Sequence, residues 1–357
     1  MDCRNYRYSR WRPIAIKLLT SYGKECAKMM RKSIKNSNIL VVGGAGFMGS
    51  HLVDRLIKEK AKQVVVMDNL FMGKQSNLQA AVKQGAILHI DDAENQEALE
   101  FIMIDYKIDI VFNCATKPLN YSFINPSNAY MTNVTVLKNL LELQRKKLFQ
   151  TLCHFSSSEA YGSAQYEPMD EEHPLVPTTT YAAGKAAADL MLQSYVRMFH
   201  LDAFIVRPFN NYGPRQNFEG AFAGVIPVTI KKILDGEVPE IHGDGKQTRD
   251  FIYVEDMVDI VLKVFPLLSK GECINITTDQ QTSIRTVVET IIDTMNYKGK
   301  ALEKPARIAD VISHRGSNEK LTKMIGAYQK TSFKTGIKNT VDWLEDVLRE
   351  ELNRPAN

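Results

Sequence analysis

A tyrosine and a lysine four residues apart give this sequence its clearest chemical signal. Tyr181 and Lys185 stand at the two ends of the segment YAAGK, which we predict to begin a helix. Side chains four residues apart share one face of a helix, so the lysine cation can stabilise a tyrosinate and lower its pKa. Such a pair can remove the proton of an alcohol while hydride leaves for a nicotinamide. The serine-rich segment SSSEAYG, residues 156–162, supplies hydroxyls that can hydrogen-bond the reacting oxygen.

A glycine-rich segment near residue 45 predicts the cofactor site. Gly43, Gly46 and Gly49 have the spacing GxxGxxG between a predicted strand at Ile39–Val42 and a predicted helix at 47–60. The first glycines permit a tight turn and the close approach of a pyrophosphate, whereas the third permits close helix–strand packing. The free N–H groups of the helix amino terminus attract phosphate. We expect Phe47 and Met48, which begin this helix, to border the cofactor as well.

Acidic residues after the next two strands complete the predicted cofactor site. Asp68 follows the second strand, about twenty residues after the glycines, where a carboxylate binds the adenosine ribose. A carboxylate there repels a 2′-phosphate, which favours NAD over NADP, and Asn69 comes next. Asp92, or its neighbour Asp91, follows the third strand. Asp92 contacts the adenine amino group in one interpretation and caps a helix in the other.

Small residues end the fourth predicted strand at the same edge. Cys114 and Ala115 follow Ile108–Asn113, and their size lets the backbone approach the cofactor. We interpret Cys114 as a packing residue, because no basic residue that would activate its thiol is adjacent in sequence. No cysteine or histidine spacing typical of a metal site occurs, so we predict no metal.

Apolar periodicity predicts an α/β fold of the Rossmann type, a doubly wound parallel sheet with a smaller C-terminal α/β lobe. Strands alternate with helices up to Arg207, and parallel strands need such crossover connections. We divide the chain into a basic N-terminal extension (1–37), an NAD-binding domain (38–207) and a partly discontinuous substrate lobe (208–357). The predicted strands are Ile39–Val42, Gln63–Met67, Ile87–Ile90, Ile108–Asn113, Thr151–Ser156 and Ala203–Val206, with Glu240–His242 and Cys273–Thr277 in the lobe.

Charge and composition exclude several classes of protein. The 357 residues are 44% hydrophobic and carry a net charge of +4. Residues 1–37 hold ten Lys and Arg against two acidic residues, which leaves −4 for the rest. A mildly acidic body argues against nucleic acid as a partner. No apolar run reaches the roughly 20 residues of a membrane span. The five scattered cysteines favour a reducing, cytoplasmic setting. For the extension, we favour a helix packed on the body or a weakly ordered segment over a membrane-surface helix.

Over residues 38–352 the chain resembles the extended short-chain dehydrogenase/reductases, and within them the nucleotide-sugar epimerase/dehydratase group. The matching stretches are VVGGAGFMGSHL, VVVMDNL, HFSSSEAYG, YAAGK, RPFNNYGPR and GDGKQTRDFIYVED. The resemblance implies that Ser157 is the catalytic serine, beside Tyr181 and Lys185. It also implies that Asn133 supports the active site, and that Asn133, Tyr181 and Lys185 contact the cofactor.

The same resemblance implies a substrate lobe that binds the diphosphate of a nucleotide sugar. The matching residues are Asn210, Arg249 and Arg307, and Ser158 borders the sugar. Arginine guanidinium groups suit phosphate oxygens because they bind bidentately. For either arginine, the alternative is a surface ion pair. Members of the group commonly dimerise, which implies a homodimer through the helices predicted at 127–147 and 181–199.

Glu159 bears on which reaction the resemblance implies. In sugar-nucleotide 4,6-dehydratases a glutamate at this position removes the C5 proton, so Glu159 favours a 4,6-dehydratase. Ser158 stands where enzymes acting on dTDP-glucose have an acidic aspartate, which argues against that substrate. A 4-epimerase is the alternative, a UDP-glucuronate decarboxylase the third, and a non-catalytic NAD-binding protein the interpretation from another class. Glu159 as a solvated loop carboxylate is the competing structural interpretation.

Overall fold

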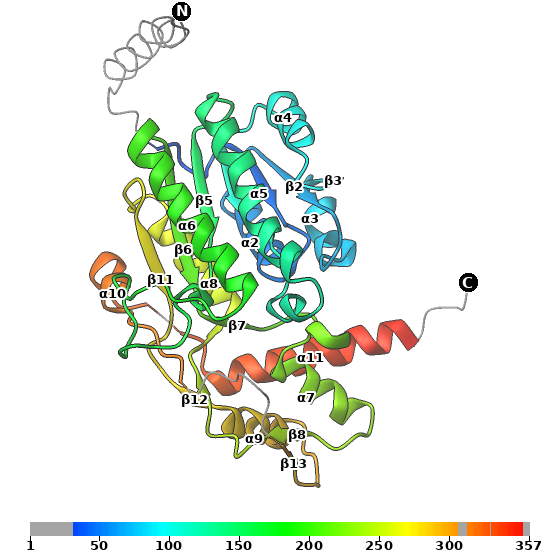
Figure 1. Cartoon of the computed structure of the whole chain (residues 1–357). Helices are drawn as coiled ribbons and strands as arrows, with labels where there is room; N and C mark the ends of the chain where they lie inside the picture. The colour runs from blue at the N-terminus through cyan, green and yellow to red at the C-terminus, as the bar shows by residue number, and fades with distance from the viewer. Residues whose placement is uncertain (1–30, 306–312, 329, 353–357) are drawn as a thin grey trace, which may run out of the picture.

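The computed structural model describes residues 31–305, 313–328 and 330–352 (Figure 1). Most of the basic extension, Met29 and Met30 included, lies outside this part of the chain. Arg307 lies outside it too.

A seven-stranded parallel sheet forms the centre of the molecule. Its order is β11-β6-β5-β4-β1-β2-β3, and every neighbouring pair runs parallel. Most of these strands are short runs of Val, Ile, Leu and Phe, as expected for strands that are buried on both faces. Their bounds are β1 (Asn38–Val42), β2 (Gln63–Asp68), β3 (Ile87–Ile90), β4 (Ile110–Asn113), β5 (Thr151–Phe155), β6 (Asp202–Pro208) and β11 (Cys273–Ile276).

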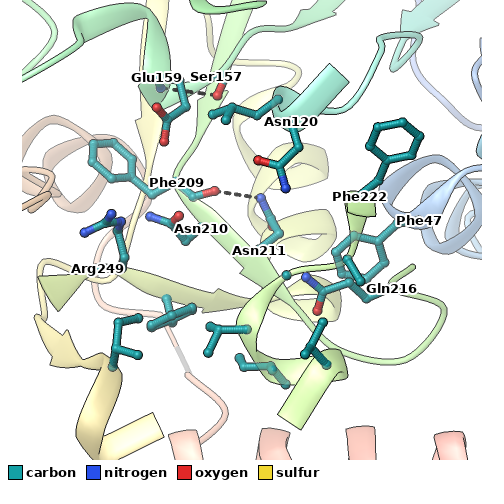
Figure 2. A pocket seen from close by; sticks show the side chains of 18 of the residues that line it. Phe47, Asn120, Ser157, Glu159, Phe209, Asn210, Asn211, Gln216, Phe222 and Arg249 are labelled. Carbon is teal, nitrogen blue, oxygen red and sulfur yellow. Dashed lines mark hydrogen bonds between the residues drawn. The ribbon is translucent and has the colours of Figure 1, made fainter. Parts of the chain in front are cut away.

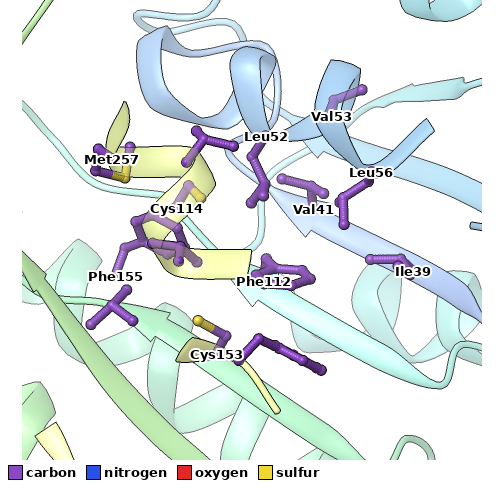
Figure 3. Packing of buried hydrophobic residues seen from close by; sticks show 14 of the residues in the cluster. Ile39, Val41, Leu52, Val53, Leu56, Phe112, Cys114, Cys153, Phe155 and Met257 are labelled. Atoms are coloured by element: carbon purple, nitrogen blue, oxygen red, sulfur yellow. The ribbon is translucent and has the colours of Figure 1, made fainter. Parts of the chain in front are cut away.

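Helices cover both faces of the sheet and create two separate cores. The first core joins the sheet to α2, α3, α8 and α10, and Figure 3 shows Leu52, Phe112, Phe155 and Met257 within it. The second joins the opposite face to α4, α5 and α6. The bounds are α2 (Phe47–Lys58), α3 (Gln79–Lys83), α4 (Gln96–Asp105), α5 (Pro126–Arg145), α6 (Thr180–Phe199), α8 (Val254–Val264) and α10 (Glu319–Ile325). The predicted doubly wound α/β fold is therefore confirmed.

The smaller lobe stands over the carboxyl ends of the strands (Figure 1). It contains α7 (Val225–Leu234), α9 (Ile284–Thr294) and α11 (Phe333–Leu352), which share a third core around Ile230, Val287 and Ile337. Three two-stranded sheets complete it. They pair β7 (Asn210–Tyr212) with β10 (Phe251–Tyr253), β8 (Glu240–His242) with β13 (Leu302–Lys304), and β9 (Thr248–Arg249) with β12 (Thr282–Ser283).

One strand lies elsewhere than its sequence position suggests. We placed the strand near residue 273 in the smaller lobe, but β11 pairs with β6 and forms an edge of the central sheet. All four residues of β11 are buried, so the strand completes the hydrophobic core and covers the free edge of β6. About sixty residues separate the two strands along the chain, and periodicity alone gives no sign of such a pairing.

Candidate functional site

The turn between β1 and α2 leaves no room for side chains. Gly43 has a φ of +74°, and a Cβ atom there would lie 2.7 Å from the backbone nitrogen of Ala115. A Cβ on Gly49 would lie 2.2 Å from the carbonyl oxygen of Gly43. Gly46 is the N-cap residue of α2 and supplies no side-chain hydrogen bond. The first N–H groups of α2 are therefore available to an anionic ligand, as a pyrophosphate requires.

Asp68 is held rigidly at the end of β2. Its carboxylate accepts hydrogen bonds from the backbone N–H groups of Ala45 (2.9 Å) and Leu70 (2.8 Å). Burial raises the pKa of Asp68, while these backbone bonds oppose the rise. A Cβ on Gly73 would lie 2.7 Å from a carboxylate oxygen of Asp68, so this segment also passes close by. The carboxylate is thus fixed where a ribose hydroxyl would meet it.

Asp92 binds Asn69 and does not cap the following helix. The side-chain amide of Asn69 donates to Asp92 at 2.9 Å. The N-cap residue of α4 is Asn95, whose side chain accepts from the N–H groups of Glu97 and Ala98. The capping interpretation of Asp92 is therefore wrong, because the helix begins three residues later.

Most of the cofactor residues predicted from the sequence line one cavity of about 270 Å³, but Asn133, Tyr181 and Lys185 do not. Cys114 lines this cavity, and burial raises the pKa of its thiol to about 12, so the thiol stays neutral. A glycine cradle, open helix N–H groups and a fixed carboxylate fit a bound dinucleotide. The predicted residues in this cavity are Gly43, Gly46, Phe47, Met48, Gly49, Asp68, Asn69, Asp92, Cys114 and Ala115.

Tyr181 and Lys185 follow one face of α6 beneath the end of β5. Thr179 begins this helix, because its hydroxyl accepts from the N–H of Ala182. The Nζ atom of Lys185 donates to the carbonyl oxygen of Phe155 at 2.8 Å. Burial lowers the pKa of Lys185 to about 8. Burial also raises the pKa of Tyr181 to about 12, against a hydrogen bond with Ser157 that lowers it.

Asn133 lies behind the site and lines neither cavity. Its Oδ1 accepts from the Thr116 hydroxyl at 2.8 Å, and its Nδ2 donates to the carbonyl oxygens of Ala129 (3.1 Å) and Tyr181 (3.5 Å). Asn133 therefore ties α5 to α6 and holds the backbone of Tyr181. This placement agrees with a supporting role but not with the expected contact with the cofactor, because Asn133 does not line the cofactor cavity.

A second cavity, of about 560 Å³, opens between the sheet and the smaller lobe. Ser157, Glu159, Tyr181, Asn210 and Arg249 all line it. Figure 2 shows Glu159, Asn210 and Arg249 together on one side, with Phe47 and Phe222 on the other. The cavity thus joins three predicted catalytic and two predicted substrate-binding side chains from distant parts of the chain, whereas Lys185 is buried and lines neither cavity.

Ser158 is placed differently from our expectation for a substrate-binding residue. It is buried and lines neither cavity. Ser157 caps the short 3₁₀ turn Ser158–Tyr161, and its hydroxyl accepts from the N–H of Glu159 at 3.2 Å. This turn brings Ser157 and Glu159 to the cavity and leaves the residue between them in the interior.

The second cavity also contains groups that sequence reasoning did not identify. Gln216, Lys232 and His242 line it. So do Gly224 and Val225, where α7 begins without a side-chain cap. The amino terminus of this ten-residue helix therefore faces the cavity near Arg249 and favours an anionic group. An N-capping glycine and scattered polar residues give too weak a signal to be recognised in a sequence.

The described residues form neither a membrane-spanning helix nor a metal-binding cluster. No described helix is long and apolar enough to cross a membrane. Within residues 31–305, 313–328 and 330–352, no group of three or more His, Cys, Asp or Glu side chains is arranged to hold a metal ion.

Comparison with known proteins assigns the chain to a family. The sequence profile described as the NAD dependent epimerase/dehydratase family matches residues 39–277. A putative UDP-glucose 4-epimerase of Methanocaldococcus jannaschii is 33% identical over 86% of this chain and 98% of its own length.

Two solved structures share the fold. The UDP-glucose 4-epimerase of Thermotoga maritima, solved with UDP-glucose, is 31% identical with a TM-score of 0.82, over 87% of this chain and 99% of the other. The dTDP-glucose 4,6-dehydratase of Bacillus anthracis, solved with NAD, is 28% identical with a TM-score of 0.78, over 87% and 97%. These relatives support an epimerase or dehydratase of nucleotide sugars and divide between the two reactions.

Proposed function

Because the chain belongs to the NAD-dependent epimerase/dehydratase family, whose cofactor is NAD, we propose that it is a nucleotide-sugar 4,6-dehydratase. The observation that carries this choice is the position of Glu159. Its side chain lines the same cavity as Ser157 and Tyr181. The Glu159 carboxylate can therefore act there as a second base, in addition to Tyr181. Oxidation at C4 alone needs no such carboxylate.

The first half of the reaction uses the residues at the start of α6. NAD, when bound, supplies the acceptor for hydride from C4 of the hexose and later returns it. Tyr181 removes the proton of the 4-hydroxyl, Ser157 hydrogen-bonds the same oxygen, and the Lys185 cation stabilises the tyrosinate. In the protein without cofactor or substrate, burial raises the pKa of Tyr181 to about 12. The Lys185 cation and the hydrogen bond from Ser157 are therefore needed to oppose that burial.

Glu159 serves the elimination step. The 4-keto group acidifies the C5 proton, and the carboxylate removes it. The C6–oxygen bond then breaks, and the proton taken from C5 leaves with the C6 hydroxyl as water. A C5–C6 double bond remains, and it accepts hydride at C6 and a solvent proton at C5. The other described carboxylate lining the cavity is Glu240, which already pairs with Lys232 at 3.3 Å.

The smaller lobe would hold the diphosphate of the substrate. The side-chain nitrogen of Asn210 is buried and has no hydrogen-bond partner among the described residues, so it is available to a phosphate oxygen. Arg249 and the amino terminus of α7 line the same cavity. We propose Arg307 as a further phosphate ligand from sequence alone. The substrate class is therefore a nucleotide-diphosphate hexose.

A nucleotide-sugar 4-epimerase is the second candidate, because the M. jannaschii and T. maritima relatives are more similar to this chain than the dehydratase is. An epimerase needs only Ser157, Tyr181 and Lys185, and then Glu159 is structural.

The experiment incubates the protein with UDP-, GDP- and dTDP-hexoses in deuterated water and reads the products by mass spectrometry. Loss of water with one solvent deuteron retained is the predicted result. An unchanged mass with a new sugar isomer would identify a 4-epimerase and contradict the proposal. Loss of carbon dioxide from a hexuronate would identify a decarboxylase, and no turnover of any sugar would favour the non-catalytic interpretation.

We also propose a homodimer through α5 and α6, because Met131, Leu190 and Met198 are exposed apolar side chains on these two neighbouring helices. A monomer in light scattering at micromolar concentration would contradict it.

A cytoplasmic location is proposed because Cys114, Cys153 and Cys273 are buried free thiols.

A further inference from the structure

A buried carboxylate continues the catalytic face of α6. Asp189 lies four residues after Lys185 and eight after Tyr181, so the three side chains follow one face of the helix. Asp189 is 1% exposed. Its Oδ2 accepts hydrogen bonds from the Ser156 hydroxyl (2.6 Å) and the Arg207 guanidinium (2.7 Å). Burying a carboxylate this deeply costs free energy unless hydrogen bonds and an opposite charge compensate it.

Two hydrogen bonds fasten this face to the end of β5. Lys185 donates to the carbonyl oxygen of Phe155, and Ser156 donates to Asp189. Phe155 and Ser156 immediately precede Ser157, which lines the substrate cavity. The two bonds therefore set the position of Ser157 relative to Tyr181, from the side that faces away from the substrate.

The same network reaches the cofactor cavity through His154. The Nδ1 atom of His154 lies 3.1 Å from the amide nitrogen of Asn113, so we assign Nδ1 as an acceptor and place the ring proton on Nε2. Nε2 faces Asp189 at 3.7 Å. The side-chain oxygen of Asn113 accepts from the N–H of Ala115, which lines the cofactor cavity. A row of polar groups thus runs from that cavity toward Asp189, although the 3.7 Å between His154 and Asp189 is longer than a hydrogen bond.

The charges around Lys185 give Asp189 a specific task. Its neighbours on β4 and β5, Cys114 and His154, are neutral, because burial raises the pKa of the thiol to about 12 and holds the pKa of the imidazole well below its usual value. On α6 stand Tyr181 and Asp189, and on β6 stands the Arg207 cation. Glu159, on the 3₁₀ turn, faces Tyr181 from the cavity side. Burial lowers the pKa of Lys185, and Asp189 is the strongest influence that raises it.

We propose that Asp189 is a positioning residue that keeps Lys185 protonated and in register with the end of β5. Through Lys185 it governs the Tyr181–Ser157 pair. The proposal rests on the roles given above to Tyr181 and Lys185, and it is independent of the dehydration step.

The alternative is that Asp189 only neutralises Arg207. A double substitution distinguishes this alternative from the proposal. Asp189→Asn removes the carboxylate charge and keeps the shape. Asp189→Asn with Arg207→Gln removes both charges, so the core keeps the same net charge as the wild type and can fold where the single variant fails. An inflection in the pH dependence that disappears in Lys185→Met belongs to the titration of Lys185.

The measurement is the dissociation constant of NAD as a function of pH, by calorimetry on the full chain freed of cofactor. We expect a wild-type inflection near pH 8 that Lys185→Met abolishes. In both Asp189 variants we expect this inflection at least one pH unit lower, because the lysine loses its carboxylate.

An inflection that stays in place in the double variant would overturn the proposal and leave Asp189 as a counter-ion of Arg207. A wild-type curve with no inflection that depends on Lys185 would overturn it as well. No sugar takes part in this measurement, so its outcome is separate from the success or failure of the dehydratase assay.

Discussion

The cofactor cavity and the substrate cavity are built from different parts of the chain. The cofactor cavity lies at the ends of β1, β2 and β4, beside a turn where Gly43 and Gly49 admit no Cβ atom. The substrate cavity is lined by residues that extend along the chain from Phe47 to Ile284, and most of them belong to the smaller lobe. Steric limits at the glycine turn therefore specify the cofactor cavity. The placement of a few polar groups from distant parts of the chain specifies the substrate cavity.

This difference explains why cofactor and reaction are predictable to different degrees. A backbone site can serve every enzyme of a family unchanged, because its ligand is the same in all of them. A side-chain site can change its reaction through one residue, here Glu159. Substitutions in the cofactor cavity should accordingly impair NAD binding, whereas substitutions in the substrate cavity should impair the reaction or the binding of the sugar.

The largest effect is expected from Gly49→Ala in the cofactor cavity. The new Cβ would meet backbone atoms of Gly43 and Gly44 at 2.2 and 2.8 Å, and these cannot move aside. We expect loss of bound NAD, and with it all turnover, together with a destabilisation of about 3 kcal/mol or more. Cofactor content and urea denaturation measure both. Gly46→Ala is the matched control for stability, because its Cβ would meet only the Gly43 oxygen at 3.2 Å. Equal destabilisation by the two substitutions would contradict the steric account.

Tyr181→Phe should remove chemistry and spare cofactor binding. We expect the rate of NAD reduction by the sugar, followed at 340 nm, to fall about 10²- to 10⁴-fold. Bound NAD should stay at the wild-type level. Tyr166→Phe is the control, because that hydroxyl bonds only Asp170 at the surface among the described partners. An active Tyr181→Phe enzyme would remove Tyr181 from the role of base.

Buried histidines should make the protein acid-sensitive. Burial lowers the pKa of both His51 and His314 from 6.5 to about 4. As the pH falls below 6.5, the unfolded chain takes up protons that the folded protein refuses, so stability is lost between pH 6.5 and 4. Each histidine accounts for about 3 kcal/mol once the pH is below 4. Urea denaturation at pH 7.5, 6 and 5 measures this loss, and His51→Gln should reduce it. A flat profile would show that these imidazoles titrate normally.

Arg249→Ala should affect the substrate cavity alone. Losing a charged hydrogen bond to a phosphate costs about 1.5–3 kcal/mol, so KM for the nucleotide sugar should rise about 10- to 100-fold. NAD content should not change. Arg315→Ala is the control, since Arg315 pairs with Asp279 outside both cavities. An unchanged KM would leave Arg249 with a structural role.

The smallest effect is expected where the two regions meet at the surface. Lys74, beyond β2, and Glu219, in the smaller lobe, form an ion pair of 3.0 Å whose side chains are 40% and 52% exposed. Glu219→Ala should cost less than about 1 kcal/mol, because solvent screens such a pair. Thermal denaturation and KM measure it. A larger loss would mean that the junction of the lobes depends on this contact.

Sequence patterns predicted the parts of the site that depend on local geometry. The glycine turn, Asp68 and the Tyr181–Lys185 pair all lie within single strand–turn–helix units, where spacing fixes position. The position of Ser158 was missed, and the choice between the two interpretations of Asp92 stayed open, because each depends on one turn of backbone. The pairing of β11 with β6, and the contacts of Asp189 with Ser156 and Arg207, were missed because they join residues from separate elements.

The central claim is that Glu159 removes the C5 proton, and Glu159→Gln tests it most directly. With a sugar that the wild type converts, the account predicts that this variant still reduces bound NAD on the addition of substrate. It should lose the release of water and the incorporation of deuterium at C5. A Glu159→Gln variant that turns over its sugar at the wild-type rate would contradict the account and leave Glu159 with a structural role.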